Sequence, residues 1–285
     1  MKKIILLLTI STHLFGALSD TVHSSISTFY ENKFFSNSKQ KDKGDTYGVG
    51  IDIHYDNSAY KIIYENGYTN TIKPPLKENL KTDKLFLKYV YKFNDNIKMN
   101  LNYINILNDN IAITSGGKAY GVGITNNFNE KLAVNFTQFY TDYKDFNVNQ
   151  SDLRIDFKTK IDGLKLKISS ITKYINIDEE NLNHFTKNAK NNYLTSGIKL
   201  HSHYYGYHFG VGAYFGKRAF AIMDDGFKIQ HHSMEFDRTY AVGVGKIIDK
   251  FVVRVQYIYQ RATELPISNK NVELQVLKLT TNYKF

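Results

Sequence analysis

The chain ends, at residues 277–285, with the sequence LKLTTNYKF. Side chains along a β-strand point alternately to its two faces. One face of this stretch would carry Leu277, Leu279, Thr281, Tyr283 and Phe285, and the other would carry Lys278, Thr280, Asn282 and Lys284. The stretch therefore predicts a strand with an apolar, aromatic face and a wet, basic face.

The final Tyr283-Lys284-Phe285 resembles the C-terminal strand of Gram-negative outer-membrane β-barrels, in which the terminal Phe belongs to the assembly signal. The resemblance implies a closed barrel in the outer membrane of a Gram-negative bacterium. Such a barrel presents its apolar face to lipid and its polar face to the lumen. The rest of the chain should then contain many strands with the same alternation.

The opposite end of the chain predicts export. Met1-Lys2-Lys3 is a short basic region, Ile4 to Ile10 is apolar, and Ala17-Leu18-Ser19 offers a cleavage site of small residues. The apolar run is much shorter than the ~20 residues that a spanning helix needs. We expect residues 1–19 to be a signal peptide and residues 20–285 to be the barrel domain.

The composition favours a β-rich chain without disulfides. The sequence has no Cys and no Trp, only 3 Pro, and 22 Tyr and 19 Phe. Aromatic residues favour strands, and the missing cysteines exclude a disulfide-held fold. The mean hydropathy of −0.39 is compatible with a barrel that has a polar lumen and wet loops.

Period-two alternation predicts about fourteen strands, with twelve or sixteen as the range. The expected strands cover residues 21–30, 46–55, 59–68, 83–93, 97–107, 118–126, 131–141, 151–161, 164–174, 192–201, 203–215, 237–247, 251–261 and 273–285. The predicted fold is an all-β, transmembrane, antiparallel up-and-down barrel.

Short and long connections alternate between these strands. Tight turns are expected at residues 56–58, 94–96, 128–130, 162–163, near Ser202 and at 249–250, and longer polar segments at 31–45, 69–82, 108–117, 142–150, 175–191, 216–236 and 262–272. This order is typical of barrels with short periplasmic turns and long extracellular loops. Segment 216–236 is the one long enough to fold into the lumen.

A glycine-rich pattern recurs along the chain. The sequence YGVGI at residues 47–51 returns at 120–124, with looser copies at 209–212 and 240–244. The glycines of each copy share one face, which we expect to face the lumen and leave room for residues across it. These copies are not dinucleotide-binding motifs, because the third glycine and the following helix are missing.

Two histidine motifs contain side chains that could support chemistry. His201 and His203 would share a strand face near His208, but too few ligands converge for a metal site, and a wet turn explains them better. His231-His232-Ser233 resembles the His-x-Ser pair of outer-membrane phospholipases, although Met234-Glu235 replaces their Asn-Gly. We therefore predict no catalytic residue, no metal and no cofactor.

The basic residues make a more coherent pattern, with a net charge of +10. If the apolar faces meet lipid, the lumen face collects cations, because a charge on the lipid face costs ~2–4 kcal/mol at the midplane. The predicted pore-lining residues are Lys61, Lys88, Lys92, Lys98, Arg154, Lys158, Lys160, Lys167 and Arg254, and the same face also holds Lys165, Lys199, Lys278 and Lys284. The predicted gating-loop residues are Lys217, Arg218, Asp224 and Asp225.

A lumen this basic would attract anions. The same cations could instead pair across a filled lumen, or reach toward headgroups and lipopolysaccharide at the strand ends. Nucleic acid is not an expected partner of an exported chain without a compact basic-aromatic patch.

In architecture the chain resembles monomeric porins. The resemblance implies a non-enzymatic channel for passive diffusion of small hydrophilic solutes, with anions favoured. Two alternatives remain: a phospholipase-like hydrolase at the barrel rim, and a non-conducting surface barrel whose loops bind partners. The barrel could work as a monomer or as a homotrimer.

Overall fold

The computed structural model of the chain describes residues 22–72, 78–109, 113–178 and 188–285, and the predicted signal peptide lies outside them. Fourteen strands close into one barrel. They are β1 (Val22–Ser36), β2 (Lys41–Tyr55), β3 (Ser58–Thr71), β4 (Leu80–Lys92), β5 (Ile97–Asp109), β6 (Lys118–Asn127), β7 (Leu132–Asp142), β8 (Asn147–Ile161), β9 (Leu164–Asp178), β10 (Asn192–Tyr204), β11 (Tyr207–Arg218), β14 (Met234–Ile248), β15 (Phe251–Glu264) and β16 (Asn269–Lys284).

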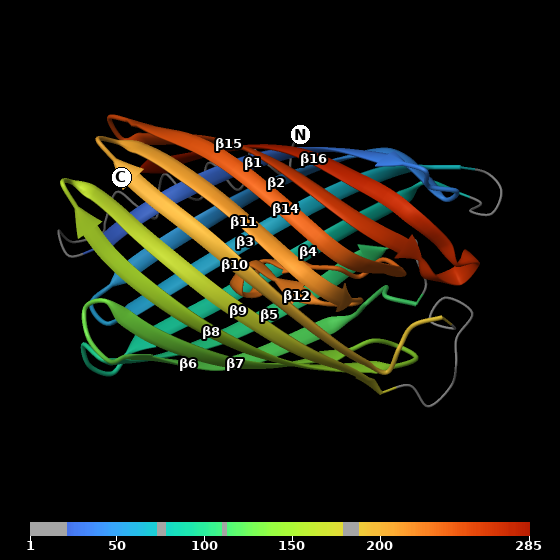
Figure 1. The fold of residues 1–285 in the computed structure, drawn as a ribbon, viewed down its shortest axis with the longest axis horizontal. Coiled ribbons are helices and arrows are strands. Elements are labelled where there is room, and N and C mark those ends of the chain that lie inside the picture. The colour runs from blue at the N-terminus through green and yellow to red at the C-terminus, as the bar shows by residue number, and fades with distance from the viewer. Residues whose placement is uncertain (1–21, 73–77, 110–112, 179–187) are drawn as a thin grey trace.

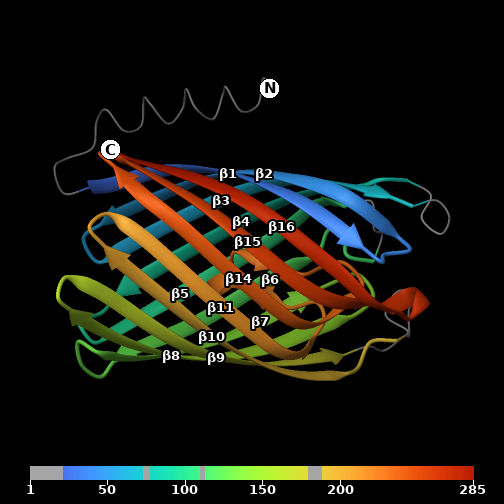
Figure 2. The same ribbon diagram turned by 45° about the horizontal axis from the view of Figure 1, so that its top comes forward.

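Each barrel strand pairs antiparallel with its neighbours along the chain, and β1 closes the barrel against β16 (Figure 1). The closing register runs from Ser25 opposite Lys284 to Ser36 opposite Glu273. A second view shows the same wall of tilted strands (Figure 2). The predicted fold class and strand number are confirmed.

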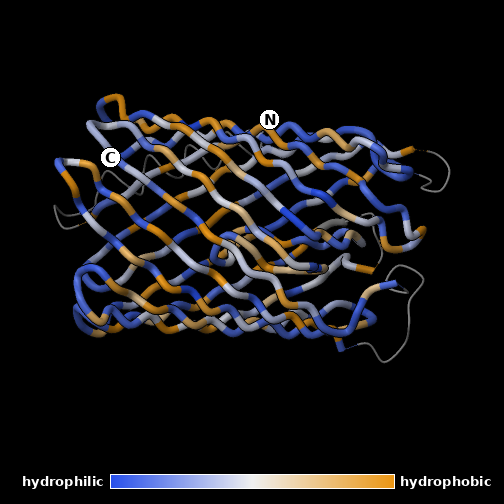
Figure 3. Tube along the Cα trace, viewed as in Figure 1, coloured by the Kyte–Doolittle hydropathy of each residue, from blue (hydrophilic) through white to orange (hydrophobic). Residues whose placement is uncertain are grey.

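The exterior of the barrel is apolar because the strands alternate as predicted. On β16, Leu277, Leu279 and Phe285 are about half exposed on the outside, whereas Val272 and Val276 are buried inside. Alternating colours along each strand show the same period in Figure 3. A closed sheet with an apolar outer band satisfies its backbone hydrogen bonds internally, as a membrane requires. The chain is thus a transmembrane barrel of the outer-membrane type.

Aromatic side chains concentrate near both ends of the outer surface. Ring pairs Tyr30–Tyr47 and Tyr103–Tyr120 lie toward one end, with centroids 4.9 and 5.5 Å apart. At the other end, Phe251 lies 4.8 Å from Tyr283. Aromatic girdles of this kind sit at the two membrane–water interfaces of transmembrane barrels.

The two ends of the barrel differ in their connections. At one end, hereafter the turn end, strands are joined by residues 56–57, 93–96, 128–131, 162–163, 205–206 and 249–250. At the other, the loop end, the connections are 37–40, 72–79, 110–117, 143–146, 179–191, 219–233 and 265–268. The predicted long segments 31–45 and 142–150 are therefore wrong in extent, because the flanking strands continue through most of them.

One predicted turn is misplaced. The connection expected near Ser202 lies at Tyr205-Gly206, where both residues have positive φ (44° and 80°). Two-residue hairpins favour this left-handed conformation, which glycine adopts at little cost. His201 and His203 consequently lie on the wall of the barrel within β10, and the wet-turn interpretation of them is wrong.

Some glycines do not open the lumen as expected. Gly48 lies opposite Phe29, and Gly121 lies opposite Phe139. In both places the neighbouring ring covers the glycine so closely that a Cβ atom would collide with it. The missing side chain thus makes room for an aromatic ring of the adjacent strand, not for a residue across the lumen.

Among the described residues, no helix is long and apolar enough to cross a membrane. The two short helical segments there are single 3-10 turns, η1 (Asp224–Gly226) and η2 (Leu265–Ile267).

Candidate functional site

The connection between β11 and β14, residues 219–233, lies inside the barrel and is called the lumen segment below (Figure 1). It contains β12 (Ile222–Met223), η1 and β13 (Lys228–Ile229). The two short strands pair with each other, and the Gln230 amide donates to the Ala221 carbonyl at 2.8 Å. The lumen segment is therefore a compact hairpin whose tip is η1.

Apolar packing holds the base of this hairpin against the barrel wall. Ala219, Phe220 and Ala221 have no exposed surface. The Phe220 ring lies 4.8 Å from Phe146 and 5.9 Å from Tyr143, between ring centroids. The wall contributes further buried side chains, namely Phe86, Ile104, Phe139, Ile171, Ile175 and Tyr193. The inner face is therefore apolar in the part of the lumen that these side chains line, where they bury the lumen segment.

Gln150 on β8 fixes the position of β12. Its side-chain amide donates to the Ile222 carbonyl at 2.7 Å and accepts from the Ile222 amide at 2.8 Å. The side chain is almost fully buried and also donates to Asp152 at 2.8 Å. Sequence reasoning missed this residue, because an inward amide gives no signal that distinguishes it from other polar lumen residues.

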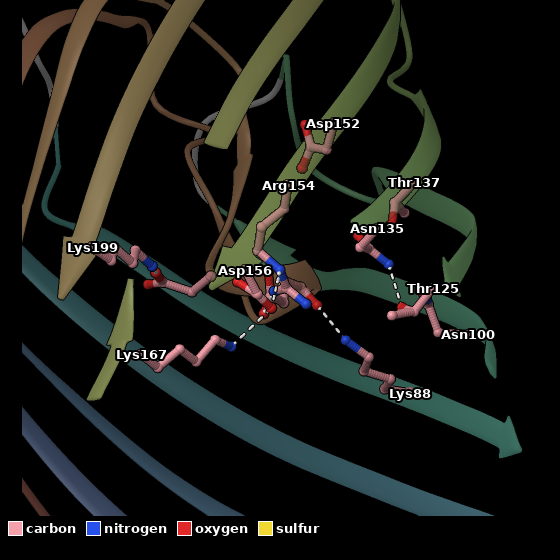
Figure 4. Close-up of polar contacts among 12 residues, drawn as sticks. Lys88, Asn100, Thr125, Asn135, Thr137, Asp152, Arg154, Asp156, Lys167 and Lys199 are labelled. Carbon is pink, nitrogen blue, oxygen red and sulfur yellow. Dashed lines mark hydrogen bonds and ion pairs between the residues drawn. The ribbon is translucent and has the colours of Figure 1, made fainter. Parts of the chain in front are cut away.

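The tip of the lumen segment is held by charge. Lys199 lies 3.0 Å from Asp224, Arg154 pairs with Asp225, and Lys88 donates to the Asp225 carbonyl oxygen at 2.9 Å. Figure 4 shows Lys88, Arg154 and Lys199 directed toward this one region from different strands. The three cations thus form a cradle for two carboxylates.

The cradle shifts the pKa values of both tip carboxylates. Desolvation inside the barrel would by itself raise the pKa of Asp224, but Lys199 and Lys228 outweigh it and hold that pKa well below its ordinary value. At Asp225 burial is likewise outweighed, by Arg154 and Lys88, and the pKa is again lowered. Both side chains are therefore anionic while the tip is docked.

A second set of contacts ties β13 to the opposite wall. Lys228 lies 4.0 Å from Glu31, which also pairs with Lys278 at 2.9 Å. The attraction of Glu31 raises the pKa of Lys228. Beside it, the Phe227 ring lies about equally far from the ammonium groups of Lys61 and Lys88, 5.2 and 5.3 Å from the ring centroid.

Most predicted pore-lining residues lie on the lumen wall. Lys61 and Lys88 contact the lumen segment, and the residues that line cavities in the lumen are Lys88, Lys98, Arg154, Lys158, Lys160, Lys167 and Arg254. Lys92 differs, since it pairs with Asp95 at 2.5 Å in the turn between β4 and β5.

Two of the four predicted gating-loop residues lie outside the lumen segment. Asp224 and Asp225 form its tip, whereas Lys217 and Arg218 are the last residues of β11. Lys217 pairs with Glu235 at 2.5 Å. Arg218 is completely buried between the rings of Tyr214 and Phe236, at 5.7 and 5.6 Å from their centroids.

A cavity of about 910 Å³ opens between the turn end and the lumen segment. It reaches from Glu130 in the β6–β7 turn to Met223 and Asp224 at the hairpin. Nine cationic side chains line it against two acidic ones, Glu130 and Asp224, and the cations are Lys131, Lys158, Lys160, Lys165, Lys167, Lys199, Lys228, Arg254 and Lys278. The cavity wall is therefore strongly basic.

The His231-His232-Ser233 motif lies in the lumen segment, and all three side chains are at least mostly buried. The Thr114 hydroxyl is 3.4 Å from His231 Nδ1, and the Ser233 hydroxyl has no hydrogen-bond partner among the described residues. The pair is not arranged as a base and its nucleophile. Within residues 22–72, 78–109, 113–178 and 188–285, no group of three or more His, Asp or Glu side chains is placed to hold a metal ion.

The sequence matches no protein-family model and no curated protein. Several solved structures share the fold. A bacterial polysaccharide outer membrane secretin superposes with a TM-score of 0.54 at 10% identity, over 94% of this chain and 99% of that chain. Omp33 of Acinetobacter baumannii gives 0.52 at 9% identity, over 93% and 100%, and the NanC porin gives 0.50 at 10%, over 90% and 100%. At these identities the likeness establishes the outer-membrane barrel fold alone.

Proposed function

We propose that this barrel is a porin-like channel for passive diffusion of small hydrophilic solutes, that it prefers anions, and that the lumen segment gates it. The observation that carries the proposal is the basic cavity, in which nine cations face two carboxylates. Rings of Lys and Arg attract anions and repel cations in pores. Low-dielectric walls around such a cavity strengthen this field.

Pairing neutralises the charge of the cavity only in part, although Lys199 pairs with Asp224 and Lys228 with Glu31. Lys167 pairs with Asp156 at 3.0 Å, and Lys278 pairs with Glu31. Among the described residues, no carboxylate forms an ion pair with Lys158, Lys160 or Arg254. These cations remain available to passing anions.

The gating part of the proposal rests on the contrast between the two halves of the lumen. The turn-end half is open and basic, whereas the hairpin and apolar wall side chains fill the other half. Opening would require the tip to leave its cradle of Lys88, Arg154 and Lys199, and Phe220 to leave its pocket. In this proposal Asp224 and Asp225 act as the releasable contacts, and Arg218 and Lys217 act at the hinge.

The packed lumen segment also favours one alternative, a non-conducting barrel. Conductance of the purified barrel in planar lipid bilayers separates the two. The channel predicts discrete conductance steps, and uptake of small neutral and anionic solutes by proteoliposomes. Replacing Lys158, Lys160 and Arg254 by Gln should reduce anion preference, whereas replacing Lys92 by Gln should leave it unchanged. A barrel that stays silent even with the lumen segment destabilised would refute the channel.

A further inference from the structure

The larger cavity contains a recess whose floor has no side chains. Gly210 on β11 lies directly opposite Gly243 on β14, and Gly245 is opposite His208. All of them line the cavity. Gly210 and Gly243 leave a hollow against the strand backbone, between β10 and β15, whereas the Arg254 side chain covers Gly245.

Basic side chains frame this recess from both sides. A Cβ atom at Gly210 would lie 3.3 Å from the His201 ring, and one at Gly245 would lie 2.5 Å from the Arg254 side chain. Arg254 is the register partner of Gly245, and His201 that of Gly210. The recess is therefore bordered by the His201 imidazole on one side and by the aliphatic part of the Arg254 side chain on the other.

The sheet register continues this border as two rows of basic residue types, in which Lys158 faces Lys167 and Lys160 faces Lys165. In one row, Lys158 on β8 faces Lys167 on β9, which faces His201 on β10. In the next row, Lys160 faces Lys165, which faces His203, which faces His208. Like charges directly opposite on one sheet face destabilise each other, because their Cβ atoms are only ~5 Å apart.

The second row also carries unused polar atoms. The rings of His203 and His208 stack with centroids 4.5 Å apart, and the Nε2 atom of each is buried without a hydrogen-bond partner among the described residues. Lys160 and Lys165 form no ion pair with any carboxylate there. A dianionic ligand would supply the counter-charge that Lys160 and Lys165 lack.

We propose that the glycine recess and the two basic rows form a binding site for a small polar molecule that carries a phosphate-type dianion. A phosphate monoester has about two negative charges near neutral pH and three strong acceptor oxygens. Its phosphate would lie at Lys160 and Lys165 on β8 and β9, and its polar body would extend past His203 toward Gly210 and Gly243. The cavity, at about 910 Å³, is large enough for such a molecule.

This inference deepens the proposed anion passage, but binding is measured without any current, so the two can fail separately. The folded full-length barrel, in uncharged detergent at constant ionic strength, is titrated calorimetrically with glucose 6-phosphate, inorganic phosphate, glucose and chloride. We expect saturable 1:1 binding of glucose 6-phosphate, weaker binding of inorganic phosphate, and none of glucose or chloride.

The variant Lys160→Gln/Lys165→Gln should weaken binding of both phosphates by about tenfold or more, because charge-assisted hydrogen bonds are lost. Lys92→Gln/Lys98→Gln is a matched control, since Lys92 and Lys98 are also register partners but neither lines the larger cavity. Gly210→Val should weaken binding of the ester more than that of inorganic phosphate. Heat-modifiable gel migration checks that each variant is folded.

Three results would overturn the site: no saturable binding by the wild type, equal weakening by the two double variants, or binding of chloride as strong as that of phosphate. Binding that matches expectation on a barrel that carries no current would support the site and refute the proposed channel.

Discussion

Truncating Phe220 to Ala should release the lumen segment. The ring has no exposed surface and packs against Phe146 and Tyr143. Phe→Ala changes at such sites cost about 3–5 kcal/mol. The substitution destabilises the docked state relative to the undocked state by this amount, because the ring is not packed when the segment is undocked. Because ~1.4 kcal/mol corresponds to a tenfold change in an equilibrium constant, the undocked fraction should rise by about two to four orders of magnitude.

Cysteine labelling measures this fraction cleanly, because the chain has no cysteine of its own. Ala221→Cys places a thiol next to Phe220 at a position with no exposed surface. A charged maleimide should label it slowly in the otherwise wild-type barrel, and faster by the factor above when Phe220→Ala is added. Phe136→Ala, which truncates a Phe that is 46% exposed on the outside, is the matched control.

Equal labelling rates with and without Phe220→Ala would refute the reasoning. Fast labelling in the otherwise wild-type barrel would refute it as well, since the lumen segment would then not be docked at all.

Three further outcomes are expected. Asp224→Asn/Asp225→Asn should raise the labelling rate by only about two- to thirtyfold, because both carboxylates are about half exposed (54% and 56%) and such pairs contribute about 0.2–1 kcal/mol each. Because docking lowers the pKa of both carboxyls, its contribution is full above their ordinary pKa of about 3.9 and is lost as pH falls through the docked values, so the ratio of the double variant's labelling rate to the wild-type rate, taken at the same pH so that the thiolate fraction cancels, should fall toward one below about pH 4. Gly121→Val should destabilise the barrel by about 1–3 kcal/mol in urea unfolding. The double variant Gly121→Val/Phe139→Ala should lose less stability than the sum of the two single losses, and purely additive losses would contradict the ring contact.

The strands and their faces could be predicted because a barrel strand encodes its environment locally. Each side chain meets either lipid or the lumen, so the period of two appears in the sequence itself. Leu277 and Lys278 already reveal the two sides of β16. The strand ends are less clear, since polar residues such as those of 31–33 continue a strand without changing its pairing.

The predicted turn after β10 is misplaced for a local reason. The polar sequence around His201 and His203 is typical of a solvated turn, whereas both side chains face the lumen. Tyr205 adopts a left-handed conformation that favours Gly or Asn. An aromatic residue at this position is not typical of a turn, so the sequence does not indicate one there.

The length of 216–236 is enough to predict that it could enter the lumen, but not what holds it there. Gln150 meets Ile222 across 72 residues of chain, and Phe220 meets Phe146 across a similar separation. Such contacts depend on barrel closure and register, and no local pattern contains them. The apolar inner wall could not be predicted for the same reason. Ile171 and Ile175 pack in one cluster with the lumen segment only when β9 has its position in the closed barrel.

The reversal potential of the Phe220→Ala barrel in a planar bilayer under a KCl gradient tests the central claim most directly. With the lumen segment released, current should flow through the cavity lined by Lys158, Lys160 and Arg254. The account predicts a reversal potential displaced toward the chloride equilibrium potential. Displacement toward the potassium equilibrium potential, or the absence of any current, would contradict it.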